Sequence, residues 1–180
     1  MLTPDDLLEA RILIIDDEPG IVEVLRFRLA AAGYENIRTT SDPTQAVALY
    51  REHQPDLVFC DLRMPDMDGF QVIEALSREE ESGYLPLLVM TAAFDDADGR
   101  LRAFSLGAKD FISKPLDFPE VTVRVRNLLQ VRLLYNRLAE SNTGLRHVTR
   151  RLEAVLDATG DAIVMYDTAE RLVFANQPYR

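Results

Sequence analysis

The stretch "PDLVFCDLRMPDMDG", residues 55–69, changes from a buried strand to a loop at an aspartate. Residues 57–60 are all apolar, which is typical of a short strand buried on both faces of a sheet. Asp61 closes this run, and Pro65 and Gly69 indicate a loop after it. Because a carboxylate is costly to desolvate, its place at the end of a buried strand indicates a site that needs negative charge.

The same alternation of apolar strands and amphipathic segments extends on both sides of this stretch. Strands are predicted at residues 11–16, 36–41, 56–60, 85–91 and 109–113. Apolar residues recur at helical spacing between them, in residues 19–33, 42–50, 70–76 and 95–107. This alternation predicts an α/β domain, with a parallel sheet and helices on both of its faces.

Polar residues stand where the predicted strands end. Asp16 and Asp17 end the first strand, Asp61 the third and Thr91 the fourth, and Lys114 follows the fifth. The carboxyl ends of parallel strands meet at one edge of a sheet, so these side chains are expected to converge. Three neighbouring carboxylates repel one another, which predicts a hard divalent cation such as Mg²⁺ among them. An aspartate can also act as a nucleophile that forms an aspartyl-phosphate, with the cation, the lysine and the hydroxyl stabilising the phosphoryl oxygens.

Four short motifs resemble those of a response-regulator receiver domain of two-component signalling: "IIDDE" (14–18), "CDLRMPDMDG" (60–69), "VMTA" (89–92) and "DFISKP" (110–115). The resemblance covers about residues 10–130. It implies a flavodoxin-like (βα)₅ doubly wound sheet with strand order 2-1-3-4-5. It also implies that a histidine kinase or a phosphotransfer protein delivers a phosphoryl group to Asp61.

The resemblance assigns further roles at the same edge of the sheet. The Mg²⁺ ligands that it implies are Asp16 through water, Asp17, Asp61 and the backbone carbonyl of Arg63. Thr91 and Phe111 would form a switch pair, in which Thr91 moves toward the phosphate and Phe111 fills the space that it leaves. Phe111 has no hydroxyl group, so the switch would depend on packing alone.

The composition is acidic, with a net charge of −10 and a pI of about 4.7, which argues against a basic nucleic-acid-binding face. Residues 1–118 carry a net charge of −12 and residues 119–156 a net charge of +4, so a change of architecture is predicted near residue 119. Cys60 is the only cysteine, which excludes a disulfide within the chain and a cysteine zinc cluster. The sequence shows neither a signal-peptide pattern nor an apolar run of membrane-spanning length, so a cytoplasmic protein is expected.

A long helix is predicted from about residue 117 or 119 onward. Its heptad pattern predicts a coiled-coil seam, with dimer contacts at Leu128, Val131, Tyr135, Leu138, Asn142, Leu145, Leu152 and Leu156. Such a seam favours a parallel homodimer, and Asn142 at a core position would favour one register. Two alternatives remain: a break between two helices at "SNTG" (141–144), where Gly144 weakens the helix, and a helix that folds back on its own domain. The arginines are spread around the helix, and no direct binding to nucleic acid is predicted.

The last segment, "LEAVLDATGDAIVMYDTAERLVFANQPYR" (152–180), resembles the opening of a PAS sensor domain. Two β-prone runs, residues 161–167 and 171–176, predict a hairpin. The predicted division is a receiver core at 1–118, the last receiver helix and coiled-coil linker at 119–157, and the start of a PAS domain at 158–180. A two-stranded hairpin is marginal alone in water, so this tail is expected to be poorly ordered or to take contacts from a neighbour.

Together these features predict a phosphorylation-dependent signalling protein, in which the receiver acts through a dimeric helical linker on a PAS-containing output region. Beyond the phosphorylation of Asp61, no enzymatic activity is expected of residues 1–180, and a histidine kinase or a diguanylate cyclase module beyond Arg180 remains an open alternative for the full-length protein. Two other classes remain: a phosphorylation-independent dimeric scaffold, and a Mg²⁺-dependent phosphatase with an aspartyl nucleophile. Such a phosphatase carries a D-x-D pattern after its first strand, whereas "DDEPG" (16–20) stands there in this chain.

Overall fold

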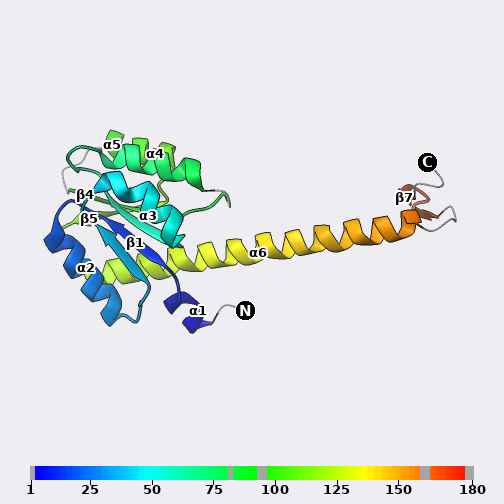
Figure 1. The fold of residues 1–180 in the computed structure, drawn as a ribbon, viewed down its shortest axis with the longest axis horizontal. Helices are drawn as coiled ribbons and strands as arrows, with labels where there is room; N and C mark the ends of the chain where they lie inside the picture. Colours follow the sequence, from blue (N-terminus) through cyan, green and yellow to red (C-terminus); the bar gives the residue numbers. More distant parts are fainter. Residues whose placement is uncertain (1–2, 81–82, 93–96, 159–162, 177–180) are drawn as a thin grey trace. The chain divides into compact units, whose positions relative to one another are not determined.

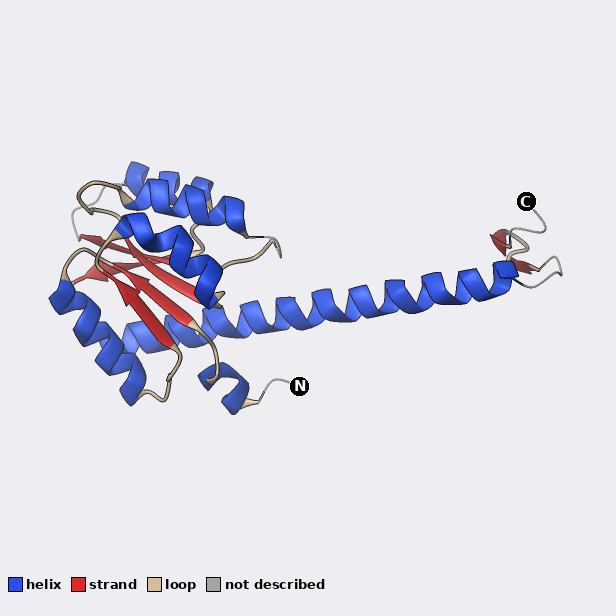
Figure 2. Cartoon of the chain, in the orientation of Figure 1, coloured by secondary structure: helices blue, strands red, loops and turns tan. Residues whose placement is uncertain are grey.

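The computed structural model describes residues 3–80, 83–92, 97–158 and 163–176 (Figures 1 and 2). The chain divides into two units, residues 1–136 and residues 137–180. The first unit contains a five-stranded parallel sheet, and the second contains a two-stranded antiparallel hairpin. Helix α6 (Phe118–Ala158) runs through the boundary between the two units.

The parallel sheet has the order β2-β1-β3-β4-β5, which confirms the predicted flavodoxin-like fold. Each strand lies within two residues of its predicted position: β1 (Ile12–Ile15), β2 (Ile37–Thr40), β3 (Leu57–Asp61), β4 (Leu87–Ala92) and β5 (Asp110–Lys114). Every residue of β1 and β3 is buried, because helices cover both faces of the sheet.

Helices lie on both faces of the sheet (Figure 2). A hydrophobic cluster on each face holds them there. Helix α2 (Pro19–Ala31) and the beginning of α6 pack against one face. The other face carries α3 (Ala46–His53), α4 (Gly69–Glu79) and α5 (Ala97–Leu106). The first unit also contains α1 (Pro4–Leu8), which Thr3 caps, and the short helix η1 (Pro43–Gln45). Residues 95 and 96, at the start of a predicted helix, lie outside the described residues.

Helix α6 is continuous over 41 residues, so the alternative of a helix break at residues 141–144 is wrong. The hairpin prediction is confirmed by β6 (Val164–Tyr166) and β7 (Leu172–Ala175), which pair antiparallel. Asn176 joins this hairpin to the end of α6. Its backbone N–H donates to the Ile163 carbonyl at 3.1 Å, and its side-chain Nδ2 donates to the Leu156 carbonyl at 2.9 Å. The short hairpin therefore takes contacts from the linker helix.

The beginning of α6 belongs to the receiver core, and this corrects part of the predicted dimer seam. Leu128 is only 9% exposed and packs in the core with Val125 and Leu129, so it lies on the side of the helix that faces the sheet. Tyr135 stacks on Tyr84, with ring centroids 5.6 Å apart. The other predicted seam residues are exposed, except for the half-buried Leu156: Val131, Leu138, Asn142, Leu145 and Leu152.

Candidate functional site

Three strand ends bring an acidic pair, a further aspartate and a lysine together at the carboxyl edge of the sheet. Asp16 follows β1, Asp61 is the last residue of β3, and Lys114 is the last residue of β5. The Nζ atom of Lys114 lies 2.9 Å from Oδ2 of Asp16 and 3.2 Å from Oδ1 of Asp61. The parallel topology explains this convergence, because all five strands end at the same edge.

The three predicted metal-binding aspartates form one cluster. Asp16, Asp17 and Asp61 each offer a carboxylate oxygen, and these oxygens lie within 4.8 Å of one another. Asp16 and Asp61 are buried and Asp17 is half-buried. Oxygen donors at this spacing suit a hard cation such as Mg²⁺, and the single ammonium of Lys114 leaves three carboxylates incompletely balanced. The donor set therefore fits a divalent cation. Arg63, the predicted backbone ligand, lies in the loop after β3 with its side chain exposed.

Burial sets the protonation of this cluster. Burial raises the pKa of Asp61 to about 6, even though Lys114 lowers it, and the negative charge of Asp16 adds to the rise. Burial alone would lower the pKa of Lys114, but the ion pairs with Asp16 and Asp61 raise it. At neutral pH, Asp61 is therefore mostly a carboxylate and Lys114 an ammonium. Burial also raises the pKa of the Cys60 thiol, so this cysteine packs in the core as a neutral group.

A close backbone contact fixes the loop that follows Asp61. The N–H of Gly69 donates to the Leu62 carbonyl at 3.0 Å, and Asp68 caps α4 through a reciprocal capping box with Gln71. A Cβ atom at position 69 would lie 2.2 Å from the backbone oxygen of Asp61. Only glycine fits here without a shift of the backbone that carries Asp61.

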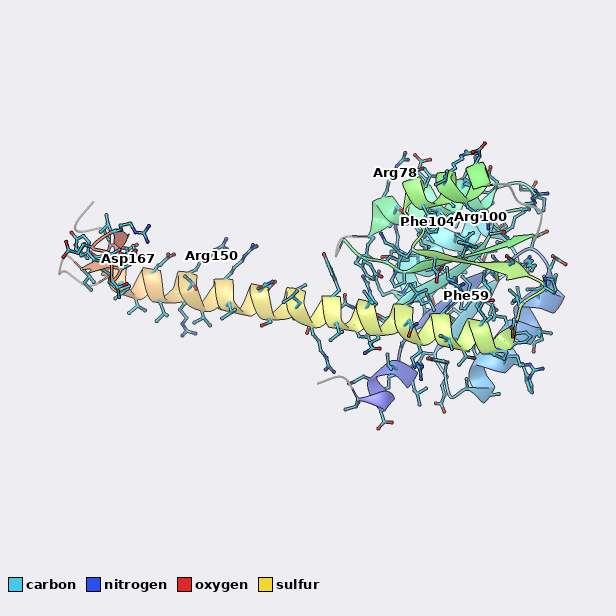
Figure 3. The ribbon with its side chains drawn as sticks, turned by 180° about the vertical axis from the view of Figure 1, so that it is seen from behind. Phe59, Arg78, Arg100, Phe104, Arg150 and Asp167 are labelled. Atoms are coloured by element: carbon cyan, nitrogen blue, oxygen red, sulfur yellow. The ribbon has the colours of Figure 1, made fainter. Side chains whose placement is uncertain are left out.

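The predicted switch residues lie on the same face of the sheet. Thr91 pairs with Ser113 and Val89 pairs with Phe111 in the parallel register of β4 and β5, so the Thr91 and Phe111 side chains share a face. Thr91 is 2% exposed, and Phe111 is half-buried. The Phe111 ring lies 6.0 Å from the Phe104 ring, edge on, and the Arg100 guanidinium lies 5.0 Å from its centroid; Phe104 and Arg100 of α5 are labelled in Figure 3.

One charged neighbour of the site was not predicted from the sequence. Oε1 of Glu18 lies 3.4 Å from Lys114 Nζ, and the backbone N–H of Glu18 donates to Oδ1 of Asp16 at 2.9 Å. Glu18 is the N-cap residue of α2, directly after the acidic pair. The position of Glu18 directly after Asp16 and Asp17 could have indicated a role at the site. Only the fold shows that β5 brings Lys114 next to Glu18.

Comparison with known proteins identifies the domain. The family model described as the response regulator receiver domain matches residues 12–126. The DNA-binding dual master transcriptional regulator RpaA of Synechocystis is 40% identical over 120 residues, which are 67% of this chain and 49% of RpaA. The response regulator PleD of Caulobacter vibrioides is 32% identical over 166 residues, 91% of this chain and 36% of PleD. The crystal structure of the receiver domain of NtrX from Brucella abortus superposes with a TM-score of 0.61 at 26% identity, covering 66% of this chain and 98% of that domain.

The chain spans half or less of the length of these two curated relatives. RpaA is a DNA-binding transcriptional regulator, so the expectation that this protein makes no direct contact with nucleic acid is unsupported. None of the helices in the described part of the chain is long and apolar enough to cross a membrane. The fold, the match over residues 12–126 and the relatives agree: the chain belongs to the response regulator receiver family of two-component signalling.

Proposed function

We propose that this receiver accepts a phosphoryl group on Asp61 with the help of Mg²⁺, and that a dimeric helical linker carries the resulting change to an output region. One observation supports the first part most strongly. The oxygens of Asp16, Asp17 and Asp61 lie within 4.8 Å of one another, and the ammonium of Lys114 contacts two of these carboxylates. This combination supplies both a nucleophile and the positive charge that phosphoryl transfer requires.

In the proposed reaction, a carboxylate oxygen of Asp61 forms a bond to the phosphorus of the donor, and the bond between that phosphorus and the donor's leaving group breaks. The ionised state of Asp61 at neutral pH provides the required lone pair. Lys114 stays close and compensates charge on the phosphoryl oxygens. A Mg²⁺ ion held by Asp17, Asp61 and the Arg63 carbonyl, and by Asp16 through water, would supply further positive charge at the same oxygens. Turnover of a phosphate ester is not part of this proposal.

The change would reach the surface through Thr91 and Phe111. Thr91 is buried, so movement of its hydroxyl toward a phosphate on Asp61 would alter the packing on this face of the sheet. Phe111 already contacts α5 through Phe104, and the Arg124 guanidinium of α6 lies 6.0 Å from its ring centroid. A shift of the Phe111 ring would therefore change its contacts with both helices.

The partners in this proposal are a histidine kinase or phosphotransfer protein, which donates the phosphoryl group, and a second copy of the chain. We place the protein in the cytoplasm, where such a donor would reach it. The output region would contain a PAS domain, of which the β6–β7 hairpin is the beginning. The antiparallel pairing of β6 and β7 after a helix supports this assignment.

The experiment that tests the first part is intact-protein mass spectrometry after incubation with acetyl phosphate. We expect one added phosphoryl group on the wild-type chain in the presence of Mg²⁺, and little or none when EDTA is present. The Asp61→Asn variant should gain no phosphoryl group, because an amide is not a nucleophile of this kind. A wild-type chain that stays unmodified and also fails to bind beryllofluoride would refute the proposal and favour the phosphorylation-independent scaffold.

A further inference from the structure

Helix α6 has one face that the receiver already occupies. The buried residues of its first half, listed from the start of the helix, are Val121, Val125, Leu128, Leu129 and Arg132. The four apolar members pack in the same core cluster as β1 and α2. A second chain cannot use this face unless the receiver core opens. Leu128, the first residue of the predicted seam, is therefore not available for dimerisation.

Buried charges fix the rotation of the helix in the first unit. Arg132 is 8% exposed, and its Nη1 atom lies 3.3 Å from Oε1 of Glu80 and donates to the Tyr84 carbonyl. Its Nε atom lies 4.0 Å from Oδ1 of Asp56, which is also buried. Rotating α6 about its axis would separate these charges in a poorly solvated place, which is costly. The face opposite Arg132 therefore stays outward.

A second stripe of apolar residues lies on α6 outside the receiver core. Val131 and Leu134 in the first unit are 48% and 50% exposed. In the second unit the exposed large apolar residues of the helix are Leu138, Leu145, Val148, Leu152 and Val155, which are 55–63% exposed. From residue 131 to 155 the positions alternate by three and four, with Ser141 in the one remaining place. This spacing is the a and d pattern of a left-handed coiled coil.

We propose that α6 pairs in parallel with α6 of a second copy along Val131, Leu134, Leu138, Ser141, Leu145, Val148, Leu152 and Val155. This inference rests on the dimeric linker of the proposed function and specifies its surface. It shares Val131, Leu138, Leu145 and Leu152 with the seam predicted from sequence. It replaces Leu128 and Tyr135, which contact the receiver, together with the polar Asn142 and the half-buried Leu156. Asn142 moves from the core to its flank, and so does Thr149, which occupies the equivalent position seven residues later in the heptad predicted from sequence.

The partner that binds this stripe is a second copy of the chain, because the same stripe on two parallel helices forms a complementary interface. In that arrangement Ser141 faces Ser141 of the partner, so each hydroxyl has a hydrogen-bonding neighbour. In an antiparallel pair along the same stripe, Ser141 would face Leu145, and Arg137 would approach Arg151 with like charge. Arg150 lies at an outer position in this register, and Figure 3 shows its side chain projecting from the helix.

A groove on the receiver extends the same face of α6 toward its beginning. The groove is lined by Val123, Asn127 and Val131, together with Asp110 of β5. Asn127 and Val131 continue the alternation of three and four residues that defines the stripe. The alternation of three and four residues is therefore continuous in sequence from the receiver into the linker.

Disulfide formation between single cysteines in the 180-residue chain tests the register. Ser141→Cys and Val148→Cys are core positions in the proposed register, whereas Asn142→Cys and Thr149→Cys are core positions in the one predicted from sequence. With copper phenanthroline as oxidant, we expect the first pair to cross-link at least fivefold faster than the second. Thr143→Cys, which is outward in both registers, and the parent chain with its buried Cys60 should give little product. Faster cross-linking of the second pair would overturn the proposal.

Light scattering on two charge variants gives an independent test. Val148→Glu should shift the chain to the mass of a monomer at tens of micromolar, while Thr149→Glu should leave the mass of a dimer. Both positions are exposed in the single chain, so the receiver should still accept a phosphoryl group in both variants. A monomeric wild-type chain would refute the dimer while leaving phosphorylation untouched. Loss of phosphorylation in a wild-type dimer would refute the proposed function instead.

Discussion

In the absence of metal, the free energy of unfolding of Asp61→Asn should increase relative to that of the wild type as the pH rises. The pKa of Asp61 is raised from 3.8 to about 6, so keeping this carboxylate charged in the folded state costs about 3 kcal/mol. Between these two values the folded wild type binds more protons than the unfolded chain, and its stability therefore falls as the pH rises. The Asp61→Asn variant lacks this term. Its stability advantage should grow by about 1.5 kcal/mol between pH 5 and pH 8.

The assay is urea unfolding in EDTA, followed by circular dichroism at several pH values. The titrating groups that do not contact Asp61 are shared by the two proteins, so they cancel in the difference between their free energies of unfolding. Asp66→Asn is a matched control, because Asp66 is an exposed aspartate in the loop that follows Asp61. Adding Mg²⁺ should stabilise the wild type more than Asp61→Asn, since one ligand is lost. A difference between wild type and Asp61→Asn that stays constant or shrinks with rising pH would refute this account of the site.

Three further substitutions probe the receiver. Lys114→Ala should slow phosphorylation by acetyl phosphate by about 10²-fold, because the ammonium beside Asp61 is lost. Lys109→Ala should keep the wild-type rate. Equal rates for the two variants in mass spectrometry would contradict the role of Lys114. Gly69→Ala should lower the free energy of unfolding in urea by about 1–3 kcal/mol, because its Cβ would overlap the Asp61 carbonyl. Gly20→Ala should leave stability unchanged, since a Cβ at position 20 meets no atom within 4 Å. A Gly69→Ala variant as stable as the wild type would show that the loop adapts to the added methyl group. Arg132→Met should cost about 3 kcal/mol, because it removes the cation beside the buried carboxylate of Glu80, although Asp56 keeps its 3.6 Å pair with Arg11. Arg51→Met at an exposed ion pair should cost about 1 kcal/mol or less, and equal losses would argue against a buried cluster.

The sequence was sufficient for the sheet and for the edge at which its polar residues meet. Buried strands such as residues 57–60 are continuous apolar runs, and the polar and loop-forming residues that end them follow directly in the sequence. Both the strands and their ends can therefore be predicted from the sequence. Once the strands are known to be parallel, their carboxyl ends must share an edge, and Asp16, Asp61 and Lys114 follow from their positions in the chain. The proximity of Glu18 to Lys114 needed the fold, because these two residues are 96 positions apart.

The face of α6 that remains for a partner was not determined by the sequence. Two heptad registers overlap between residues 128 and 156 and share Val131, Leu138, Leu145 and Leu152, so periodicity alone does not distinguish them. The tertiary structure distinguishes them, because Leu128 completes the core and Arg132 needs the buried carboxylates of Asp56 and Glu80. A helical pattern records which side chains are apolar, and only packing decides which of them the protein's own core has already covered.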